Sequence, residues 1–339
     1  MKILSVEALK QLIARHGFNN YMTDLIETLK EDYGRWQKFT KMPRPAMHVP
    51  GGVLELMPIC DETYYSFKYV NCHPKNPQSG KLTVIATGQL SRVDTGYPLM
   101  FSEMTILTAF RTAAVSALAT DLMARENAKT LAIIGTGAQS EFQIRALQLV
   151  RDITEVRFFD VDSAAMDKFE KNLASSSAKL IRCKNAGQAV DGADIITTCT
   201  ARKKHADVVK NEWVKQGMHI NTIGGDSPGK TELEFGILSR SRVVVEYLEQ
   251  ALIEGEIQRW TRDQAKKYVH AELYEIVNGT KQGRENEQEI TLFDSIGIAL
   301  EDYSALRLTY ELALKYDLGD ECGLIPDLTD PKNLIASLL

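Results

Sequence analysis

The sequence predicts an α/β protein in which an α+β region precedes a doubly wound parallel sheet. From about residue 130 onward, six short runs rich in Val and Ile alternate with helical stretches, and such unbroken apolar runs are typical of strands covered on both faces. A glycine-rich turn, "GTGAQS", follows the first run and opens a helix. Before residue 112 the chain instead alternates apolar and polar residues, which indicates an antiparallel sheet. These observations together predict a Rossmann-type fold joined to an α+β domain.

The first part of the chain is expected to hold two amphipathic helices, at about 5–15 and 20–38. Four alternating segments follow: "GVLELMPICD", "YYSFKYVN", "LTVIATGQLSRVD" and "YPLMFSEM". Gly, Pro, Asn and Asp residues separate these segments, as turns require. We therefore expect about four to six antiparallel strands here.

The second part is expected to form the parallel sheet, with right-handed crossovers between its strands. The strands are expected at residues 130–135, 156–160, 178–183, 193–200, 218–224 and 242–247. Helices are expected between the first of them, at residues 138–150, 163–176 and 185–193.

A long helix at about 295–318 is expected to return the chain to the first domain. We therefore expect a substrate-binding domain made of residues 1–112 and about 312–339. The nucleotide-binding domain is expected to span residues 113–311.

The composition is that of an ordinary globular protein. The 339 residues are 44% apolar and 25% charged, with a net charge of −5, so there is no electrostatic case for a nucleic-acid partner. The short basic run at 201–205 is expected to be a solvated surface. No unbroken apolar stretch reaches the ~18 residues of a membrane span, and the first 17 residues do not resemble a signal peptide. A cytoplasmic location without a membrane partner is therefore expected.

The five cysteines are scattered and form no CxxC pair, and the six histidines show no HxxxH spacing. This pattern predicts reduced thiols and neither a disulfide framework nor a metal site. Cys199 lies near the expected cofactor strands, where a buried small residue is the simpler interpretation than a nucleophile.

The "GTGAQS" turn predicts a dinucleotide site. Gly135 would allow the tight turn, and Gly137 would let a pyrophosphate approach the positive end of the following helix. Ser140 occupies the third small position, where Gly or Ala is more usual. Asp160 ends the second strand and is placed to bind an adenosine ribose; no Arg follows in "FFDVDS", so NAD is favoured over NADP. The alternative is an ordinary glycine-rich turn.

Three strand ends should line the crevice in which this fold binds ligands: Thr200, residues 224–226 and Glu246. The second of them belongs to the stretch "TIGGDSPGKTE". Asp226 therefore falls where chemistry at the nicotinamide is expected.

A small charged substrate needs complementary groups from the first domain. Candidates are Arg44, Glu55 with Met57 in "LELMP", Lys68 in "FKYVN" and Arg111 in "TAFRTAA". From the pattern alone, Glu55 and Lys68 could face inward or outward. Arg111 lies in an apolar helical stretch, where an Arg either snorkels or binds an anion.

A set of motifs resembles the ornithine cyclodeaminase/μ-crystallin family over residues 20–325. The motifs are "ELMPICD", "FKYVN", "RTAAVSALA", "GTGAQSEFQ", "DIITT", "GGDSPGKTEL", "EGEIQ" and "FDSIGIALEDY". The "GGDSPGKTEL" block is most similar to the cyclodeaminase branch of the family. The sequence departs from the family pattern in "VNCHP", where Cys72 stands in place of a small residue such as Gly, and in a short C-terminal tail.

The resemblance implies a redox-neutral cycle on tightly held NAD. The α-hydrogen of L-ornithine leaves as hydride, the δ-amine attacks the resulting imine, ammonia departs, and the returned hydride gives L-proline. In such a cycle Arg44, Lys68 and Arg111 would bind the α-carboxylate, with Lys68 also assisting deprotonation of the α-amine. Glu55 and Asp226 would hold the δ-amine, with Asp226 as its general base.

The same resemblance implies the further residues of the site. Met57 would line the substrate pocket, and Lys230 would lie toward the nicotinamide ribose. The residues expected to contact the cofactor are Thr83, Arg111, Gly135, Gly137, Ala138, Gln139, Asp160, Thr200, Lys230, Ser295 and Ile296.

Three alternatives stay open at this stage. A lysine cyclodeaminase would need room for one more methylene, which a pocket distinguishes by only ~1–3 kcal/mol. An NAD(P)-dependent amino-acid dehydrogenase or imine reductase would not need Asp226 to activate a second amine. A crystallin-like binding protein would need no catalytic groups. The resemblance also implies a homodimer formed through the first domain's sheet, whose edges would otherwise be exposed.

Overall fold

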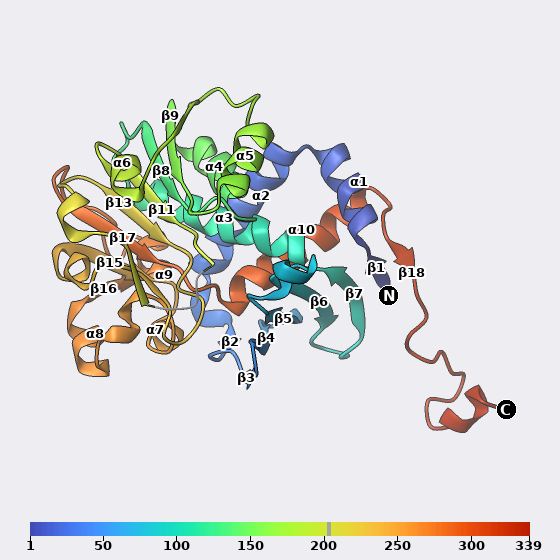
Figure 1. The fold of residues 1–339 in the computed structure, drawn as a ribbon. Helices are drawn as coiled ribbons and strands as arrows, with labels where there is room; N and C mark the ends of the chain where they lie inside the picture. The colour runs from blue at the N-terminus through green and yellow to red at the C-terminus, as the bar shows by residue number, and fades with distance from the viewer. Residues whose placement is uncertain (202–204) are drawn as a thin grey trace.

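The computed structural model describes residues 1–201 and 205–339 (Figure 1). The predicted basic run at 201–205 falls largely on residues 202–204, which lie outside the described residues. Two eight-stranded sheets stand side by side, with long helices between them. The last residues extend away from the body of the protein toward the C-terminus.

The first sheet is larger than predicted, because strands at both termini join it. Its order is β18 (Asp320–Glu321), β1 (Lys2–Leu4), β7 (Pro98–Glu103), β6 (Val84–Arg92), β5 (Tyr64–Cys72), β4 (Gly52–Cys60) and β2 (Thr40–Lys41), with β3 (Ala46–Val49) also paired to β4. The four predicted segments are β4 to β7, and they are antiparallel as expected. β1, however, pairs in parallel with β7, so the sheet is mixed.

The alternation in these strands separates a covered from an uncovered face. In β4, Val53, Glu55, Met57 and Ile59 are buried, whereas the intervening Leu56 is exposed. The helices α1 (Val6–His16) and α2 (Phe18–Gly34) precede the sheet near the predicted positions. α2 ends four residues earlier than predicted, because Trp36–Lys38 form a separate 3-10 turn.

The second sheet is entirely parallel. Its order is β10 (Lys179–Arg182), β9 (Glu155–Phe159), β8 (Thr130–Ile134), β11 (Ile195–Thr198), β13 (His219–Thr222), β17 (Ile290–Asp294), β15 (Ser241–Val245) and β16 (Val269–Glu272). All six predicted strands are present. β16 and β17 were not predicted, and β17 lies between β13 and β15 with all five of its residues buried.

Helices and a small additional strand pair surround the parallel sheet. The predicted helices are α4 (Ser140–Val150), α5 (Ser163–Asn172) and α6 (Ala186–Val190). The Asp162 carboxylate caps α5 by accepting a hydrogen bond from the Ala164 backbone N–H at 2.9 Å. The remaining elements are α7 (Leu248–Ala251), α8 (Arg262–Tyr268), α9 (Leu273–Val277) and the parallel pair β12 (His205–Val209) and β14 (Thr231–Leu233).

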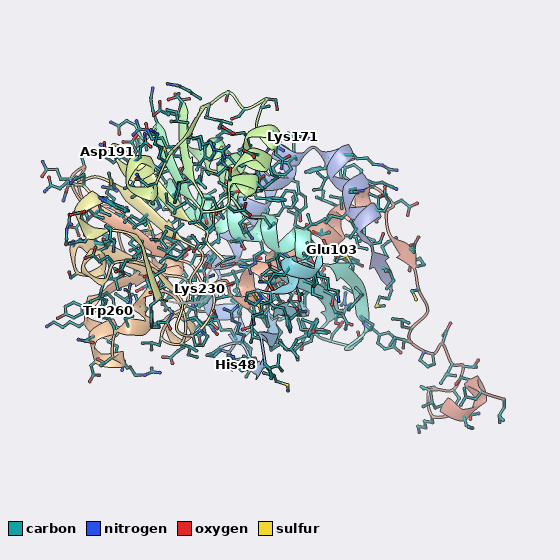
Figure 2. All side chains as sticks on the ribbon, viewed as in Figure 1. His48, Glu103, Lys171, Asp191, Lys230 and Trp260 are labelled. Atoms are coloured by element: carbon teal, nitrogen blue, oxygen red, sulfur yellow. The ribbon has the colours of Figure 1, made fainter. Side chains whose placement is uncertain are left out.

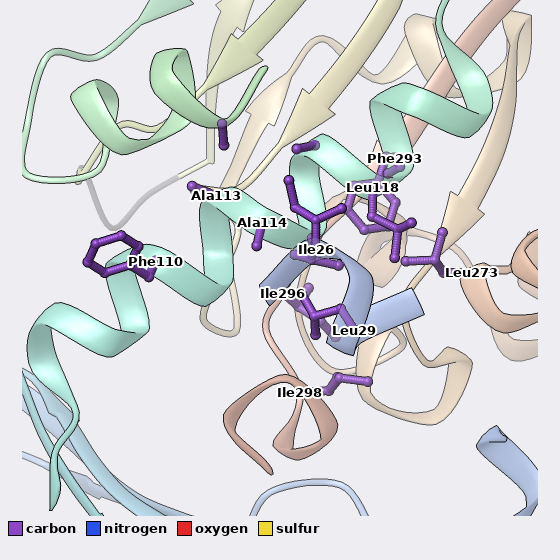
Figure 3. Close-up of a cluster of buried hydrophobic side chains, with 14 of the residues drawn as sticks. Ile26, Leu29, Phe110, Ala113, Ala114, Leu118, Leu273, Phe293, Ile296 and Ile298 are labelled. Carbon is purple, nitrogen blue, oxygen red and sulfur yellow. The ribbon is translucent and has the colours of Figure 1, made fainter. Parts of the chain in front are cut away.

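Two long helices, α3 (Thr105–Met123) and α10 (Ala299–Lys315), lie where the two halves meet (Figure 1). α3 contacts α2 and α4 as well as strands of both sheets, and α10 contacts β4, β5 and β6. One apolar cluster therefore runs through both halves; Figure 3 shows Phe110 and Leu118 of α3 together with Phe293 of β17. The predicted boundaries at 112 and about 311 fall inside these helices, and the division into domains stays a prediction.

α3 is also, among the described residues, a helix long and apolar enough to cross a membrane. It has 19 residues, and an 18-residue stretch of it has a mean hydropathy of 1.3. Most of it, 72%, is buried inside the protein, and the core helix of a globular protein passes the same test.

Candidate active site

A cavity of about 470 Å³ lies between the two sheets, at the carboxyl ends of the parallel strands. This is the edge at which doubly wound sheets bind their ligands. Figure 2 places Lys230 in the middle of the molecule, close to this edge. The predicted site residues that line the cavity are Arg44, Glu55, Lys68, Thr83, Arg111, Ala138, Gln139, Asp226, Ser295 and Ile296.

Arg44 lies on the cavity wall between two carboxylates. Its Nε is 3.2 Å from Oε1 of Glu55, and its Nη2 contacts Glu254. Nη2 also donates to the backbone oxygen of Ile296 at 3.2 Å. Burial lowers the pKa of Arg44, but the attraction of Glu254 and Glu55 outweighs this effect and raises the pKa above its usual value. The guanidinium is therefore a permanent charge at the cavity.

Lys68 and Arg111 share one buried carboxylate. The Lys68 Nζ donates to Oδ1 of Asp302 at 2.7 Å, and the Arg111 Nε lies 3.2 Å from the same oxygen. Arg111 also donates from Nη1 to Oε2 of Glu301 at 2.5 Å. The inward orientation of Lys68 was one of two open interpretations, and the structure buries it completely. Two cations thus face the cavity from strand β5 and helix α3.

Burial and neighbouring charges lower the pKa of Lys68 and raise the pKa of Glu301. Burial, helped by repulsion from Arg111, lowers the pKa of Lys68 to about 8, although Asp302 opposes the shift. Burial and repulsion from Glu246 raise the pKa of Glu301 well above its usual value, despite the nearby Arg111. Lys68 can therefore lose or gain a proton near neutral pH.

Asp226 projects from the turn after β13. Its side chain is 37% exposed, and its Oδ1 accepts a hydrogen bond from the Lys230 Nζ at 3.0 Å. The Asp226 backbone oxygen lies 3.5 Å from Nη2 of Arg44. Attraction by Asp226 and by Glu232 raises the pKa of Lys230 although burial alone would lower it. Asp226 is thus an accessible carboxylate beside two cations.

The glycines of the "GGDSPGKTE" turn allow close packing against the protein itself. A Cβ on Gly224 would lie 2.2 Å from Oε1 of Glu232, and one on Gly225 would lie 3.0 Å from Cα of Gly255. Glu232 accepts hydrogen bonds from the backbone N–H of Gly224 at 2.9 Å and from that of Thr200 at 2.7 Å. The turn after β13 is therefore tied to the end of β11.

The "GTGAQS" turn has the shape that a dinucleotide requires. Gly135 has a φ of +100°, and a Cβ there would lie 2.8 Å from the Cys199 backbone oxygen, so the position needs glycine. A Cβ on Gly137 would meet no atom within 4 Å, which leaves room for a phosphate next to the start of α4. Asp160 accepts from the Thr136 backbone N–H at 2.6 Å. These residues fit an NAD molecule lying along the turn.

Several predicted residues lie outside the lining of the main cavity. They are Met57, Gly135, Gly137, Asp160, Thr200 and Lys230. Met57 lines a small adjoining cavity that also contacts Arg44, and Thr200 donates its hydroxyl to Glu232 at 2.6 Å. Gly135, Gly137 and Asp160 belong to the turn before α4 and to its neighbouring strand end.

Glu254, Glu301 and Asp302, which pair with the cations, were not predicted from the sequence, whereas Glu246 was expected at a strand end beside the crevice. Glu301 and Asp302 hold Arg111 and Lys68, and Glu254 holds Arg44. Glu246 accepts from the Ser295 hydroxyl at 2.6 Å and from the Ile296 backbone N–H at 2.9 Å, and so positions the segment beside the cavity. The two adjacent acids in the apolar motif "FDSIGIALEDY" were the available signal, since unpaired charges are rarely buried.

Two further features of the site concern cysteines and metals. The Cys199 thiol contacts the Gly135 backbone oxygen at 2.9 Å, and burial raises its pKa well above the usual value, which does not suit a nucleophile. Cys72 is buried and lines the cavity. Within residues 1–201 and 205–339, no three His, Cys, Asp or Glu side chains are grouped as a metal site would need.

Comparisons with known proteins identify relatives along the whole chain. The model of the ornithine cyclodeaminase/mu-crystallin family matches residues 7–317. A protein named ornithine cyclodeaminase from Agrobacterium tumefaciens (strain Ach5) is 45% identical over 336 residues, which are 99% of this chain and 93% of that protein.

Two solved structures share the fold and confirm the predicted fold class. An archaeal alanine dehydrogenase dimer with bound NAD is 35% identical, with a TM-score of 0.88 over 96% of this chain and 99% of that chain. A lysine cyclodeaminase, described by its recognition of L-lysine, L-ornithine and L-2,4-diaminobutyric acid, is 30% identical, with a TM-score of 0.90 over 98% of both chains. With a family model matched over 7–317 and a relative at 45% identity, the chain belongs to the ornithine cyclodeaminase/mu-crystallin family, as its motifs predicted.

Proposed function

We propose that this protein is an NAD-dependent enzyme that converts L-ornithine to L-proline and ammonia. The observation that supports this most directly is one cavity lined both by buried cations and by the Asp226 carboxylate. An amino acid with a second amine offers a carboxylate and an ammonium to such a cavity. The relative named ornithine cyclodeaminase agrees with the proposal.

The three cations orient the substrate by its α-carboxylate. Arg44, Lys68 and Arg111 all line the cavity and come from different elements, so a carboxylate among them has one favoured position. Orientation of this kind lowers the barrier of a later step by removing freedom of motion in advance. Burial lowers the pKa of Lys68 to about 8, so a fraction of the molecules holds Lys68 as the neutral amine, and in that form it accepts a proton from the α-amine.

Asp226 and Glu55 handle the distal amine. A δ-ammonium has an ordinary pKa of about 10 and attacks nothing until it loses a proton. Asp226 is the general base for that proton, because its carboxylate is accessible from the cavity. Glu55, on β4, supplies a second negative charge that attracts the ammonium.

The "GTGAQS" turn and Asp160 hold the cofactor, with Thr83, Gln139 and Ser295 along the cavity wall. NAD bound there would supply the hydride chemistry, which is removal of the substrate's α-hydrogen and its later return to the cyclic imine. The protein's own task is to hold the substrate still and to keep water from the imine between these two events.

The test is a reaction with L-ornithine and NAD⁺ in a catalytic amount. We expect proline and ammonia in equal amounts, without accumulation of NADH. NADH formed in proportion to substrate would instead identify a dehydrogenase, and binding without turnover would identify a carrier. L-Lysine, assayed in parallel, measures the preference between the two diamino acids. Lysine cyclodeaminase activity is the second candidate function, because a lysine cyclodeaminase has a similar fold.

We also propose that two copies pair through the uncovered face of the first sheet. Leu56, Tyr65, Tyr69 and Ile85 are between 37% and 46% exposed there, although they are large and apolar. The archaeal relative is described as a dimer. Sedimentation of the wild type should show a dimer and Tyr69→Asp a monomer; a wild type that sediments as a monomer would refute the pairing. A cytoplasmic location stays part of the same proposal.

A further inference from the structure

We propose that Gln258 is a positioning residue for the Asp226 turn, acting through the backbone of residues 229 and 230. Gln258 ends the "EGEIQ" motif, to which neither the sequence pattern nor the proposed function assigns a role. The inference rests on the proposed function, because it concerns the carboxylate that frees the δ-amine.

The Gln258 side chain holds residues 229 and 230 of the turn by two hydrogen bonds and its own loop by a third. Its Oε1 accepts from the Gly229 backbone N–H at 2.6 Å. Its Nε2 donates to the backbone oxygen of Lys230 at 2.9 Å and to that of Gly255 at 2.7 Å. One amide thus uses its acceptor and its donors to join two loops that are 28 residues apart or more.

The rest of the motif holds the start of the turn and the strand β14 that follows it. The Gly255 backbone N–H donates to the Gly225 backbone oxygen at 2.7 Å. The Glu256 carboxylate accepts from the backbone N–H of Glu232 at 2.5 Å and from that of Leu233 at 3.4 Å. The segment 225–233 is therefore held at its start, at residues 229 and 230, and at its end, and Asp226 lies between the first two of these contacts.

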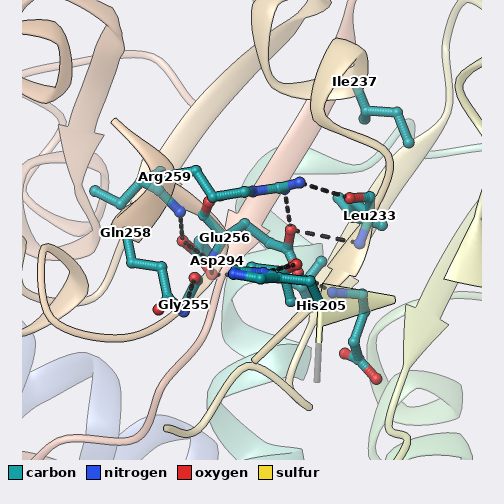
Figure 4. Close-up of polar contacts among 12 residues, drawn as sticks. His205, Leu233, Ile237, Gly255, Glu256, Gln258, Arg259 and Asp294 are labelled. Atoms are coloured by element: carbon teal, nitrogen blue, oxygen red, sulfur yellow. Dashed lines mark hydrogen bonds and ion pairs between the residues drawn. The ribbon is translucent and has the colours of Figure 1, made fainter. Parts of the chain in front are cut away.

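The motif itself is fixed to the parallel sheet (Figure 4). Asp294, at the end of β17, accepts from the Glu256 backbone N–H at 2.8 Å and from that of Ile257 at 3.0 Å. Asp294 is completely buried. Because Asp294 belongs to the sheet, these hydrogen bonds fix the motif, and with it the turn, relative to the sheet.

The same loop also contacts Arg44, whose Nη2 lies 3.5 Å from the Asp226 backbone oxygen. Glu254, four residues before Gln258, contacts the Arg44 guanidinium. The motif therefore sets the separation between a group that binds the α-carboxylate and the carboxylate that receives the δ-amine proton. A displacement of about 1 Å in such an arrangement can cost about 100-fold in rate.

Gln258 is the member of this clamp that can be changed without opening the core. It is only partly buried, whereas Glu256 and Asp294 are completely buried and their replacement would disturb the fold. In Q258M the side chain keeps its length and apolar contacts but loses all three hydrogen bonds. Q264M is the matched control, because Gln264 likewise accepts from a backbone N–H, that of Thr261 at 2.9 Å, but at the start of α8 and outside the cavity lining.

The experiment measures turnover, coupling and amide exchange in the full-length protein with NAD. We expect Q258M to lose about 10- to 100-fold in kcat for proline, while NAD affinity and the melting temperature stay equal to those of Q264M. A δ-amine that is poorly placed leaves the imine to water, so that the 2-oxo acid, ammonia and one NADH form per substrate oxidised. The fraction of such uncoupled turnover should rise in Q258M alone.

Hydrogen exchange gives a readout that does not depend on activity. Amides in the peptide covering residues 224–234 should exchange faster in Q258M, with no change elsewhere. Unchanged exchange in that peptide, or proline formation and coupling equal to the wild type, would overturn the role of Gln258. A wild type that makes no proline would overturn the proposed function instead, and the exchange rates would still decide the clamp.

Discussion

The two ends of the cavity are held in place by different physical means. At the cationic end, Lys68 and Arg111 are buried and meet the side-chain carboxylates of Asp302 and Glu301. At the other end, Asp226 is 37% exposed and its turn is held by hydrogen bonds to backbone groups. One end is fixed by charge pairing and the other by the shape of a loop.

This difference follows from what each end must do. A buried cation without a partner is strongly destabilising, so the carboxylate-binding groups need acids beside them before any substrate arrives. A general base must be reached by its substrate and must change its protonation state, so tight ion pairing on every side would hinder it. The clamp on the backbone positions Asp226, whose carboxylate accepts a hydrogen bond from Lys230 and is still 37% exposed.

The largest effect is expected at the loop end, from Asp226→Asn. The amide keeps the size of the side chain but cannot accept the δ-amine proton, so we expect proline formation to fall by about 100- to 10,000-fold. NAD affinity, measured by fluorescence titration, should not change. Asp207→Asn is the control, since Asp207 also contacts a lysine, Lys210, but lies outside the cavity lining. Near-normal turnover of the Asp226 variant would refute its role as the base.

At the cationic end, Asp302→Ala should affect folding as much as catalysis. It leaves the buried Lys68 without its carboxylate, and breaking such a pair costs about 3–5 kcal/mol of the free energy of unfolding. Urea denaturation with and without NAD measures this cost. The exposed pair of Asp94 with Arg92 provides the contrast, and Asp94→Ala should leave the denaturation midpoint unchanged. Equal denaturation midpoints for the two variants would show that the buried pair contributes no more to the free energy of unfolding than the exposed pair.

The pH dependence of stability tests whether the pKa of Lys68 is lowered in the folded protein. Lys68 loses its proton near pH 8 in the folded protein, against 10.5 for an ordinary lysine, because of burial and repulsion from Arg111. Between these values the unfolded chain binds more protons, so the contribution of Lys68 to the free energy of unfolding rises with pH, by about 3 kcal/mol over the window. The stability of the wild type relative to Lys68→Met should therefore increase from pH 8 to 10.5. Parallel curves would show that the pKa of Lys68 is not lowered.

The smallest effect is expected at the cofactor turn, which is held by a backbone contact like the Asp226 loop. Asp160→Ala removes the acceptor of the Thr136 N–H and the expected ribose partner, so NAD should bind about tenfold more weakly. Asp162→Ala, which removes the cap of α5 two residues away, is the control and should keep NAD affinity. Equal affinities for both variants would exclude Asp160 from the cofactor site.

Much of the fold could be predicted because its signals are local. All six predicted parallel strands are present, since unbroken apolar runs identify doubly covered strands. β17 was not predicted because "ITLFD" is followed at once by the predicted helix and no turn residues separate the two. β1 and β18 were not predicted, because they are short and join the sheet from opposite ends of the chain.

The sequence by itself determined most strands of the two sheets, the glycine turn and the family, and it indicated candidate residues for the site. Periodicity and the backbone freedom of Gly135 are properties of a few adjacent residues, so they can be recognised without the fold. Only the tertiary structure decided which acids neutralise the cations and what holds the Asp226 turn. Arg111 meets Glu301 across 190 residues of sequence and Lys68 meets Asp302 across 234, while Gln258 reaches back to Gly229 across 29. Such partners are chosen by how α10 and the "EGEIQ" loop pack against the sheets, and packing over these separations leaves no local pattern in the chain.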